Sequence, residues 1–149
     1  MARKEYHPPA SSAQVRERMQ AQPRKDTACE MAVRSAVHAL GLRYRVHQRP
    51  EADLRREADL VFRRDKVAVF VDGCFWHGCP EHHSPPSTHY YWWETKIGKN
   101  RARDKETDQV LRECGWVVVR IWEHEDPTEA AERVRDAVLA RRQERQGTR

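Results

Sequence analysis

The segment DLVFRRDKVAVFV, residues 59–71, decides the fold. It contains two runs rich in β-branched and large apolar residues, 59–62 and 67–71, separated by the four polar residues 63–66. Two short runs around a polar turn predict an antiparallel hairpin. The second run is apolar at every position, which is typical of a strand that is buried on both faces. We therefore expect residues 67–71 to form a central strand.

The flanking segments predict helices and a further buried strand around this hairpin. Apolar residues at three- and four-residue steps predict a helix over residues 27–41, and a charged helix is expected over 100–114. The run WVVVRIW, residues 116–122, is the strongest strand signal in the chain, and Asp126 before a proline predicts the start of a last helix. Residues 42–47 alternate between apolar and basic, as in a half-buried strand. The order of elements indicates an α/β fold with a mixed sheet flanked by helices.

The composition describes a small basic protein. The 149 residues include 28 Lys and Arg against 23 Asp and Glu, giving a net charge of +5, which favours a polyanionic partner. Residues 1–25 carry six basic and two acidic side chains, so we expect a basic arm that docks on DNA. One domain is expected over residues 26–145, followed by a flexible tail over 146–149. No apolar run is long enough for a signal peptide or a membrane span, so we expect a cytoplasmic location.

Residue types that bind zinc are concentrated after the hairpin. They are Cys74, Cys79, His82 or His83, and the more distant His124. A structural zinc ion takes four such ligands, so the spacing predicts a zinc site in which His82 and His83 are alternatives. Ordering a loop of more than twenty residues costs entropy, which a zinc site offsets. The other interpretation is two ordinary cysteines in a loop, and Cys29 and Cys114 are expected to be plain buried thiols.

Two carboxylates and a histidine are the catalytic candidates. Asp59 opens one strand of the hairpin and Asp72 follows the other, so antiparallel pairing places both at one end of the sheet. Two carboxylates there can hold Mg²⁺, and a metal-dependent nuclease also needs a base near the attacking water. His77 is the nearest candidate for that base. Asp72 precedes a glycine, and Asp-Gly is also a common strand-ending turn, so its role stays open.

Glu30 has two interpretations. It lies in the first turn of the helix expected over residues 27–41, where it could point toward the same end of the sheet and orient a metal-bound water. Thr27 and Glu30 also have the spacing of a capping box. The pattern alone favours the cap.

Large aromatic residues crowd the segment that carries the predicted zinc ligands. Such residues either stack on bases or pack under the loop as a small core. We expect Trp76, which Phe75 directly precedes, and Trp93 to be exposed. Tyr91 or Trp92 is expected to pack under the loop. Basic residues that could neutralise phosphate follow at Lys96, Lys99, Arg101 and Arg103.

Three motifs in this region resemble the very short patch repair (Vsr) endonucleases. They are VFVDGCFWHGCPEH at 69–82, WETKIGKN at 93–100 and IWEH at 121–124, within a resemblance over about residues 12–140. It implies a restriction-endonuclease-like fold of the PD-(D/E)xK type, catalytic Mg²⁺ and structural Zn²⁺. It also implies a nick 5′ to the thymine of a T:G mismatch left by 5-methylcytosine deamination. The implied setting is a nucleoid-associated monomer on double-stranded DNA, with mismatch-repair proteins and a cytosine-5 methyltransferase as partners.

The resemblance implies roles for the catalytic candidates. Asp59 corresponds to the magnesium-binding aspartate, His77 to the catalytic histidine, and Glu30 to the acidic residue that helps to order the water. This reverses the preference for a cap at Glu30. The main-chain carbonyl just before Asp72, that of Val71, binds the metal in some members, whereas the position of Asp72 varies among them.

The resemblance also implies the DNA-contacting residues. The side chains inserted beside the mismatch correspond to Phe75, Trp76 and Trp93, and Met19 corresponds to the residue that enters from the other groove. Arg18, next to Met19 in the matched segment, is expected to bind DNA. A wobble pair is cheaper to unstack than a matched pair, so such wedges discriminate partly by deformation energy. The zinc ligands correspond to Cys74, Cys79, His82 and His124.

Two other functional classes compete with this interpretation. A non-catalytic zinc module that binds distorted DNA would use the same basic arm, aromatics and zinc, but would have no use for Asp59 and His77. A zinc deaminase would need an H-x-E motif with a later P-C-x-x-C, which this sequence does not contain.

Overall fold

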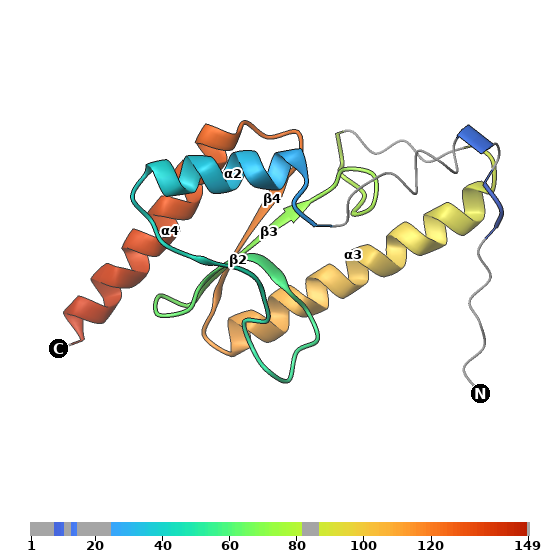
Figure 1. The fold of residues 1–149 in the computed structure, drawn as a ribbon. Helices are drawn as coiled ribbons and strands as arrows, with labels where there is room; N and C mark the ends of the chain where they lie inside the picture. Colours follow the sequence, from blue (N-terminus) through green and yellow to red (C-terminus); the bar gives the residue numbers. More distant parts are fainter. Residues whose placement is uncertain (1–7, 11–12, 15–24, 82–86, 149) are drawn as a thin grey trace.

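The computed structural model describes residues 8–10, 13–14, 25–81 and 87–148 (Figure 1). Four residues with expected roles lie outside the described residues: Arg18, Met19, His82 and His83. The division into arm, domain and tail stays a prediction.

Four strands form one mixed sheet in the order β1-β2-β3-β4. They are β1 (Arg45–Gln48), β2 (Ala58–Phe62), β3 (Val67–Asp72) and β4 (Val117–Trp122). The predicted hairpin is confirmed, because β2 pairs antiparallel with β3 and Leu60 faces Val69. Strand β4 pairs parallel with β3, so β3 has a neighbour on each side and is central, as expected.

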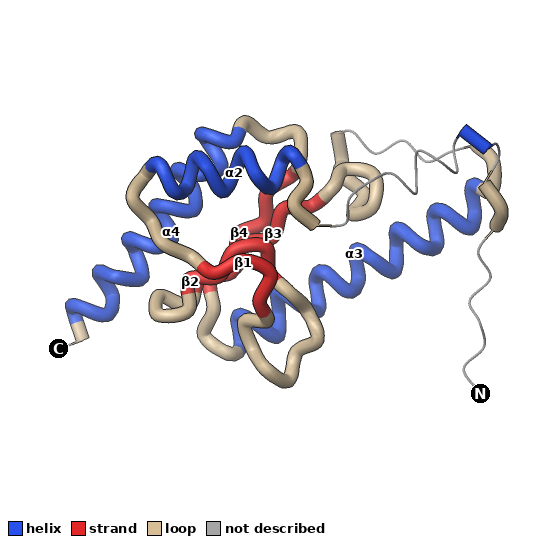
Figure 2. The backbone as a smooth tube through the Cα atoms, viewed as in Figure 1, coloured by secondary structure: helices blue, strands red, loops and turns tan. Residues whose placement is uncertain are grey.

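Helices cover both faces of the sheet (Figures 1 and 2). They are α2 (Ala28–Ala39), α3 (Tyr90–Glu113) and α4 (Pro127–Gly147). Side chains alternate along β3: Val67 and Val69 pack with α2 and α4, whereas Ala68 and Phe70 pack toward Leu111 of α3. This alternation explains why the strand is apolar throughout. None of the described helices is long and apolar enough to cross a bilayer.

Side-chain caps fix where two of the helices begin. The Thr27 hydroxyl accepts a hydrogen bond from the N–H of Glu30 at 3.2 Å, which starts α2. The Asp126 carboxylate accepts from the N–H groups of Thr128 at 2.8 Å and Glu129 at 3.1 Å, with proline at the first helical position of α4. These bonds satisfy donors that have no partner within the helix.

The start of α3 differs from the prediction. The helix begins at Tyr90 rather than at Asn100, so the segment 90–93 is helical and not part of an irregular loop. Aromatic residues have modest helix propensity, and here tertiary packing outweighs it, because Trp93 contacts the rings of two loop residues. Of the two residues expected to pack inside, Tyr91 or Trp92, Tyr91 is 85% exposed, whereas Trp92 is half-buried and contacts the ring of Trp93.

The edge strand and two cysteines also differ from expectation. Strand β1 begins at Arg45 rather than at residue 42, and Val46 is exposed because β1 is the edge of the sheet. Cys114 is exposed and Cys29 is only partly buried, so neither is a fully buried thiol. Cys114 ends α3, where the chain turns at the surface.

Candidate active site and metal centre

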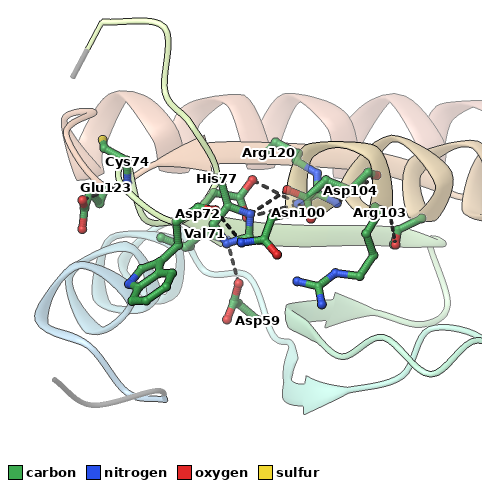
Figure 3. A network of polar contacts seen from close by, with 12 residues as sticks. Asp59, Val71, Asp72, Cys74, His77, Asn100, Arg103, Asp104, Arg120 and Glu123 are labelled. Carbon is green, nitrogen blue, oxygen red and sulfur yellow. Dashed lines mark hydrogen bonds and ion pairs between the residues drawn. The ribbon is translucent and has the colours of Figure 1, made fainter. Parts of the chain in front are cut away.

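Asp59 lies on β2 beside the end of β3. Its Oδ2 accepts a hydrogen bond from the main-chain N–H of Val71 at 2.6 Å (Figure 3). Burial raises the pKa of Asp59 to about 6; the Val71 hydrogen bond opposes this, while the charges of Glu30 and Asp72 add to it. Within the described residues Asp59 forms no ion pair. A buried carboxylate without an ion-pair partner is the type of oxygen ligand that Mg²⁺ prefers. In the described part of the chain, the two carboxylate-containing groups whose possible ligand atoms lie within 4.8 Å of one another are adjacent sets: Asp26, Glu30 and His47, and Asp72, His77 and Asp104.

His77 follows β3 and faces two carboxylates. Its Nδ1 lies 2.6 Å from Oδ2 of Asp104 on α3 and 3.7 Å from Oδ1 of Asp72. Burial lowers the pKa of His77, but the hydrogen bond with Asp104 and the charges of both carboxylates outweigh it, so the net pKa is raised. Because Nδ1 is engaged by Asp104, Nε2 is the nitrogen that can exchange a proton with a bound molecule.

Arg120 of β4 occupies the centre of a charged network on the α3 side of the sheet. Its Nη1 lies 3.1 and 3.0 Å from the two carboxylate oxygens of Asp72, and its Nη2 lies 2.7 Å from Oδ1 of Asp108. The guanidinium carbon is 4.3 Å from the centre of the Phe70 ring. Asp72 therefore has a cationic partner within the protein, whereas Asp59 has none in the part of the chain that the structure describes. Burial raises the pKa of Asp72, and the charge of Arg120 opposes that shift.

Asp104 and Arg120 are functional candidates that the sequence reasoning missed. Arg120 is the single charged residue in the run 116–122, and a charge on a buried strand requires a partner. Asn100, Asp104 and Leu111 share one helical face, at spacings of four and seven residues. These two signals could have indicated a polar contact between the strand and the helix.

Glu30 is both a capping residue and a neighbour of Asp59. Its carboxylate accepts a hydrogen bond from the N–H of Asp26 at 2.9 Å. A capping box would use the N–H of Thr27, so the donor is one residue earlier than expected. The carboxylate also lies 3.5 Å from Nη2 of Arg34. The side chain is buried, at 6% exposure, and its charge helps to raise the pKa of Asp59. Capping and an electrostatic role at the site are thus compatible.

Three of the predicted zinc ligands meet at the ends of β3 and β4. Nδ1 of His124 lies 3.2 Å from Sγ of Cys74 and 3.6 Å from Sγ of Cys79. A tetrahedral zinc ion with ordinary bond lengths places sulfur and nitrogen ligands about 3.5 Å apart, so the three atoms fit a metal. Because β3 and β4 are parallel neighbours, the residues that follow them are brought together.

Burial makes the cysteine pair dependent on a cation. It raises the pKa of Cys74 to about 11, so without a cation the thiol stays protonated at neutral pH. Zinc binding requires the thiolate and supplies the charge that stabilises it. Glu81 lies 3.5 Å from Nε2 of His124 and is placed to orient the imidazole.

The three aromatic residues expected to contact DNA form one cluster. The ring centres of Phe75 and Trp76 are 5.2 Å apart, those of Phe75 and Trp93 5.2 Å, and those of Trp76 and Trp93 5.6 Å, all edge to face. Trp76 is 37% exposed, as expected, whereas Trp93 is only partly exposed. Lys96 and Lys99 follow Trp93 on α3, so charge and rings share the N-terminal half of that helix.

Helix α3 holds the loop between Gly73 and Pro80 independently of any metal. Asn100 Nδ2 donates to the carbonyl of Trp76 at 2.8 Å, and Arg101 donates to the carbonyl of Gly78. Together with the contact between His77 and Asp104, these bonds tie three loop residues to one helix.

Gly78→Ala is expected to loosen this attachment. Gly78 has a φ of +64°, and an added Cβ would lie 2.3 Å from Nε of Arg101. The left-handed backbone and the displaced arginine together predict a loss of about 1–2 kcal/mol in the free energy of unfolding. Gly98→Ala is the matched control, because Gly98 lies within α3 with open space around it; this change should stabilise by about 0.5–1 kcal/mol. Urea denaturation of both variants checks the prediction, and equal effects would contradict it.

Comparison with known proteins adds independent observations. The family model for the DNA mismatch endonuclease Vsr matches residues 9–83. The chain is 42% identical over 135 residues to the type II nicking enzyme V.NaeI of Lentzea aerocolonigenes, covering 89% of this chain and 81% of that protein. It is 37% identical over 109 residues to the DNA mismatch endonuclease Vsr of Escherichia coli K12, covering 70% of this chain and 66% of that protein.

A third relative supports the same assignment: the type II nicking enzyme V.NmeDIP of Neisseria meningitidis serogroup C is 38% identical over 125 residues, covering 80% of this chain and 82% of that protein. Matches of this extent to enzymes set aside a non-catalytic DNA-binding module. With the expected Vsr resemblance thus confirmed, the chain belongs to the Vsr family of DNA mismatch endonucleases and is a DNA-nicking phosphodiester hydrolase.

Proposed function

We propose that this protein is a Mg²⁺-dependent endonuclease that nicks duplex DNA 5′ to the thymine of a T:G mismatch and so initiates very short patch repair. The observation that carries the proposal is the buried carboxylate of Asp59, which accepts a hydrogen bond from Val71 near the end of β3 and forms no ion pair among the described residues. His77, paired with Asp104, follows the same strand β3. The relatives include both a mismatch endonuclease and nicking enzymes, and the T:G mismatch is the substrate that we propose for this chain. We also propose a restriction-endonuclease-like fold. The four-stranded mixed sheet, with the β2–β3 hairpin at its centre, supports this proposal.

The proposed metal positions follow from the donor sets. Asp59 and the main-chain carbonyl of Val71 would hold Mg²⁺, which supplies charge stabilisation at the scissile phosphate. Cys74, Cys79, His124 and His82 would hold a structural Zn²⁺. Asp72 contributes its charge to the site while remaining paired with Arg120.

The proton transfers belong to the chain's own side chains. Nε2 of His77 accepts a proton from the attacking water, and Asp104 stabilises the imidazolium that results. Glu30, fixed by its bond to the N–H of Asp26, orients that water. These roles require His77 to be neutral before the reaction.

Recognition of the mismatch is assigned to the aromatic cluster. Phe75, Trp76 and Trp93 present a rigid group of rings that can enter the stack where pairing is weakest. Lys96 and Lys99 neutralise the adjacent phosphates. Met19 is proposed to enter from the other groove, and Arg18 to bind DNA beside it. A monomer, a nucleoid-associated cytoplasmic location, and functional links to mismatch-repair proteins and a cytosine-5 methyltransferase complete the proposal.

Nicking of defined duplexes tests the proposed function. Purified protein with Mg²⁺ is incubated with end-labelled duplexes that carry T:G, a matched pair or another mismatch in varied sequence contexts. We expect one product, cut on the 5′ side of the mismatched thymine, with the opposite strand intact. Equal cutting of matched and T:G duplexes would contradict the mismatch role and leave a nicking enzyme of other specificity.

Asp104→Asn is expected to change both the rate and its pH dependence. Loss of the carboxylate misorients the imidazole of His77 and should lower the nicking rate on the order of 10²-fold. Because Asp104 raises the pKa of His77, its removal lowers that pKa and moves the acidic limb of the rate profile to lower pH. The control is Asp108→Asn, which alters the Arg120 network without contacting His77. Rate profiles that coincide for the two variants would exclude this role for Asp104.

A further inference from the structure

A cavity lined by arginines lies at the opposite end of β2 from Asp59. Its volume is about 530 Å³, and five of its lining residues are Arg43, Arg45, Arg63, Arg64 and Arg142, a set we call the arginine cavity. Asp59 stands near the start of β2, whereas the turn after Phe62 forms the cavity wall. Four residues of extended strand separate Asp59 from Arg63, roughly 13 Å. The arginine cavity is therefore distinct from the candidate active site.

The positive charge of the arginine cavity is largely uncompensated. Asp65 is its single acidic lining residue, and that carboxylate is buried against Arg142 and Arg145 at 3.3 and 3.2 Å. Throughout the part of the chain that the structure describes, four of the lining residues make no ion pair: Arg43, Arg45, Arg63 and Arg64. Like charges gathered around one hollow repel each other, and a bound anion relieves that repulsion.

Two of the arginines are held in place before any ligand arrives. Arg63 donates to the carbonyls of Pro50 at 3.1 Å and Arg49 at 3.0 Å, which fixes its guanidinium against the segment after β1. Arg142 is fixed by its contact with the buried Asp65. A guanidinium presents its donors in a planar fork that matches phosphate, and a fixed one loses less entropy when it binds.

We propose that the arginine cavity binds the phosphodiester backbone of duplex DNA outside the segment that is cut. Its arginines come from β1 and the segment just before it, from the turn after β2, and from α4. They therefore form an extended surface that suits a polymer with repeated phosphates. The backbone has two sources, the flank of the duplex in the active site or a second duplex. Either one increases the time that the enzyme remains on DNA without adding base recognition.

The test compares two triple variants with the same loss of charge. Arg43→Gln, Arg45→Gln and Arg64→Gln are combined in one protein, and Arg55→Gln, Arg112→Gln and Arg135→Gln in the control; each has a net charge of +5 − 3 = +2. Arg63 is kept because it anchors a connection. Binding to an undamaged, matched long duplex is measured over a range of salt concentrations, so the result does not depend on mismatch cutting.

Each phosphate contact contributes about 0.9 to the slope of log affinity against log salt. We expect the slope of the cavity variant to fall by roughly 2–3 and that of the control to change by less than about 1. Arg64→Gln alone should lower the slope by about 0.9, which keeps the test valid if the triple variant folds poorly. Equal slopes for the cavity and control variants would overturn the proposal.

Two further arms identify the source of the backbone. If the cavity variant loses affinity only for duplexes that extend well beyond the active site, the cavity binds the flank of the same duplex. Weaker capture of a labelled short duplex by protein already saturated with an immobilised long duplex assigns it to a second duplex. Either result supports the proposed site. If the cavity variant loses neither affinity for long duplexes nor capture of a second duplex, the proposal is wrong.

Discussion

Asp59→Asn should lower the nicking rate by about 10³-fold or more while making the magnesium-free protein more stable. The amide keeps the size of the side chain and can still accept the hydrogen bond from the N–H of Val71. It lacks the negative charge that would hold the metal. The variant therefore separates the catalytic role of the carboxylate from its place in the fold.

The gain in stability follows from the raised pKa of Asp59. The pKa is 3.8 for the ordinary side chain and about 6 in the fold, so the folded protein binds this proton more tightly than the unfolded chain. Stability is consequently lost as pH rises from about 4 through 6, and above that range the cost is on the order of 3 kcal/mol. Asparagine does not ionise and avoids this cost, so the advantage of the variant should vanish below pH 4.

Urea denaturation at several pH values, in zinc-loaded protein without magnesium, measures this effect. Asp53→Asn is the control because Asp53 is exposed and its change should leave both stability and nicking unaltered. Unchanged cutting by Asp59→Asn would remove Asp59 from the mechanism. A variant that is inactive and also less stable at neutral pH would show that the carboxylate is structural.

Cys79→Ser is expected to abolish zinc binding and to lower the nicking rate by at least about 10²-fold. This is the second largest effect that we predict. Cys79 and Cys74 connect the loop after β3 to His124 after β4. Without the metal, the loop keeps the hydrogen bond from the Cys74 N–H to Glu123 but loses its link to His124. That loop carries Phe75, Trp76 and His77. Neither hydrophobic core cluster includes Cys74, Cys79 or His124, so the sheet itself should remain folded.

Metal analysis, nicking rate and thermal unfolding are measured together for this variant. Cys114→Ser is the matched control, because Cys114 is exposed at the end of α3 and should retain zinc and activity. Full zinc content in Cys79→Ser would contradict the assignment of this residue as a ligand. Retained activity without zinc would mean that the contacts of α3 and the hydrogen bond to Glu123 hold the loop.

The sheet could be predicted because its signals are local. Strands β2, β3 and β4 consist of short apolar runs bounded by polar turns, and burial of those runs leaves few other arrangements. The caps Thr27 and Asp126 similarly mark helix starts by their own side chains. The segment 90–93 was misassigned because its helix depends on contacts with distant rings, which no local pattern encodes.

The candidate site could be predicted only in part. The convergence of Cys74, Cys79 and His124 followed from ligand chemistry, and the placement of Asp59 near Asp72 followed from hairpin pairing. Asp104 was missed because it reaches His77 from a helix 27 residues away, across a gap that only the packing of α3 closes. A network between a strand and a helix depends on their relative orientation, which is a property of the whole fold.

The central claim is that Asp59 binds a catalytic metal ion and that His77 acts as a base close to that ion. Binding of Mn²⁺ in place of Mg²⁺, observed through paramagnetic relaxation of histidine ring signals in the zinc-loaded protein, tests it most directly. We predict strong broadening of the His77 signals, little effect on the exposed His38 of α2, and loss of the effect in Asp59→Asn. Broadening that spares His77, or that persists unchanged in Asp59→Asn, would show that the metal binds elsewhere.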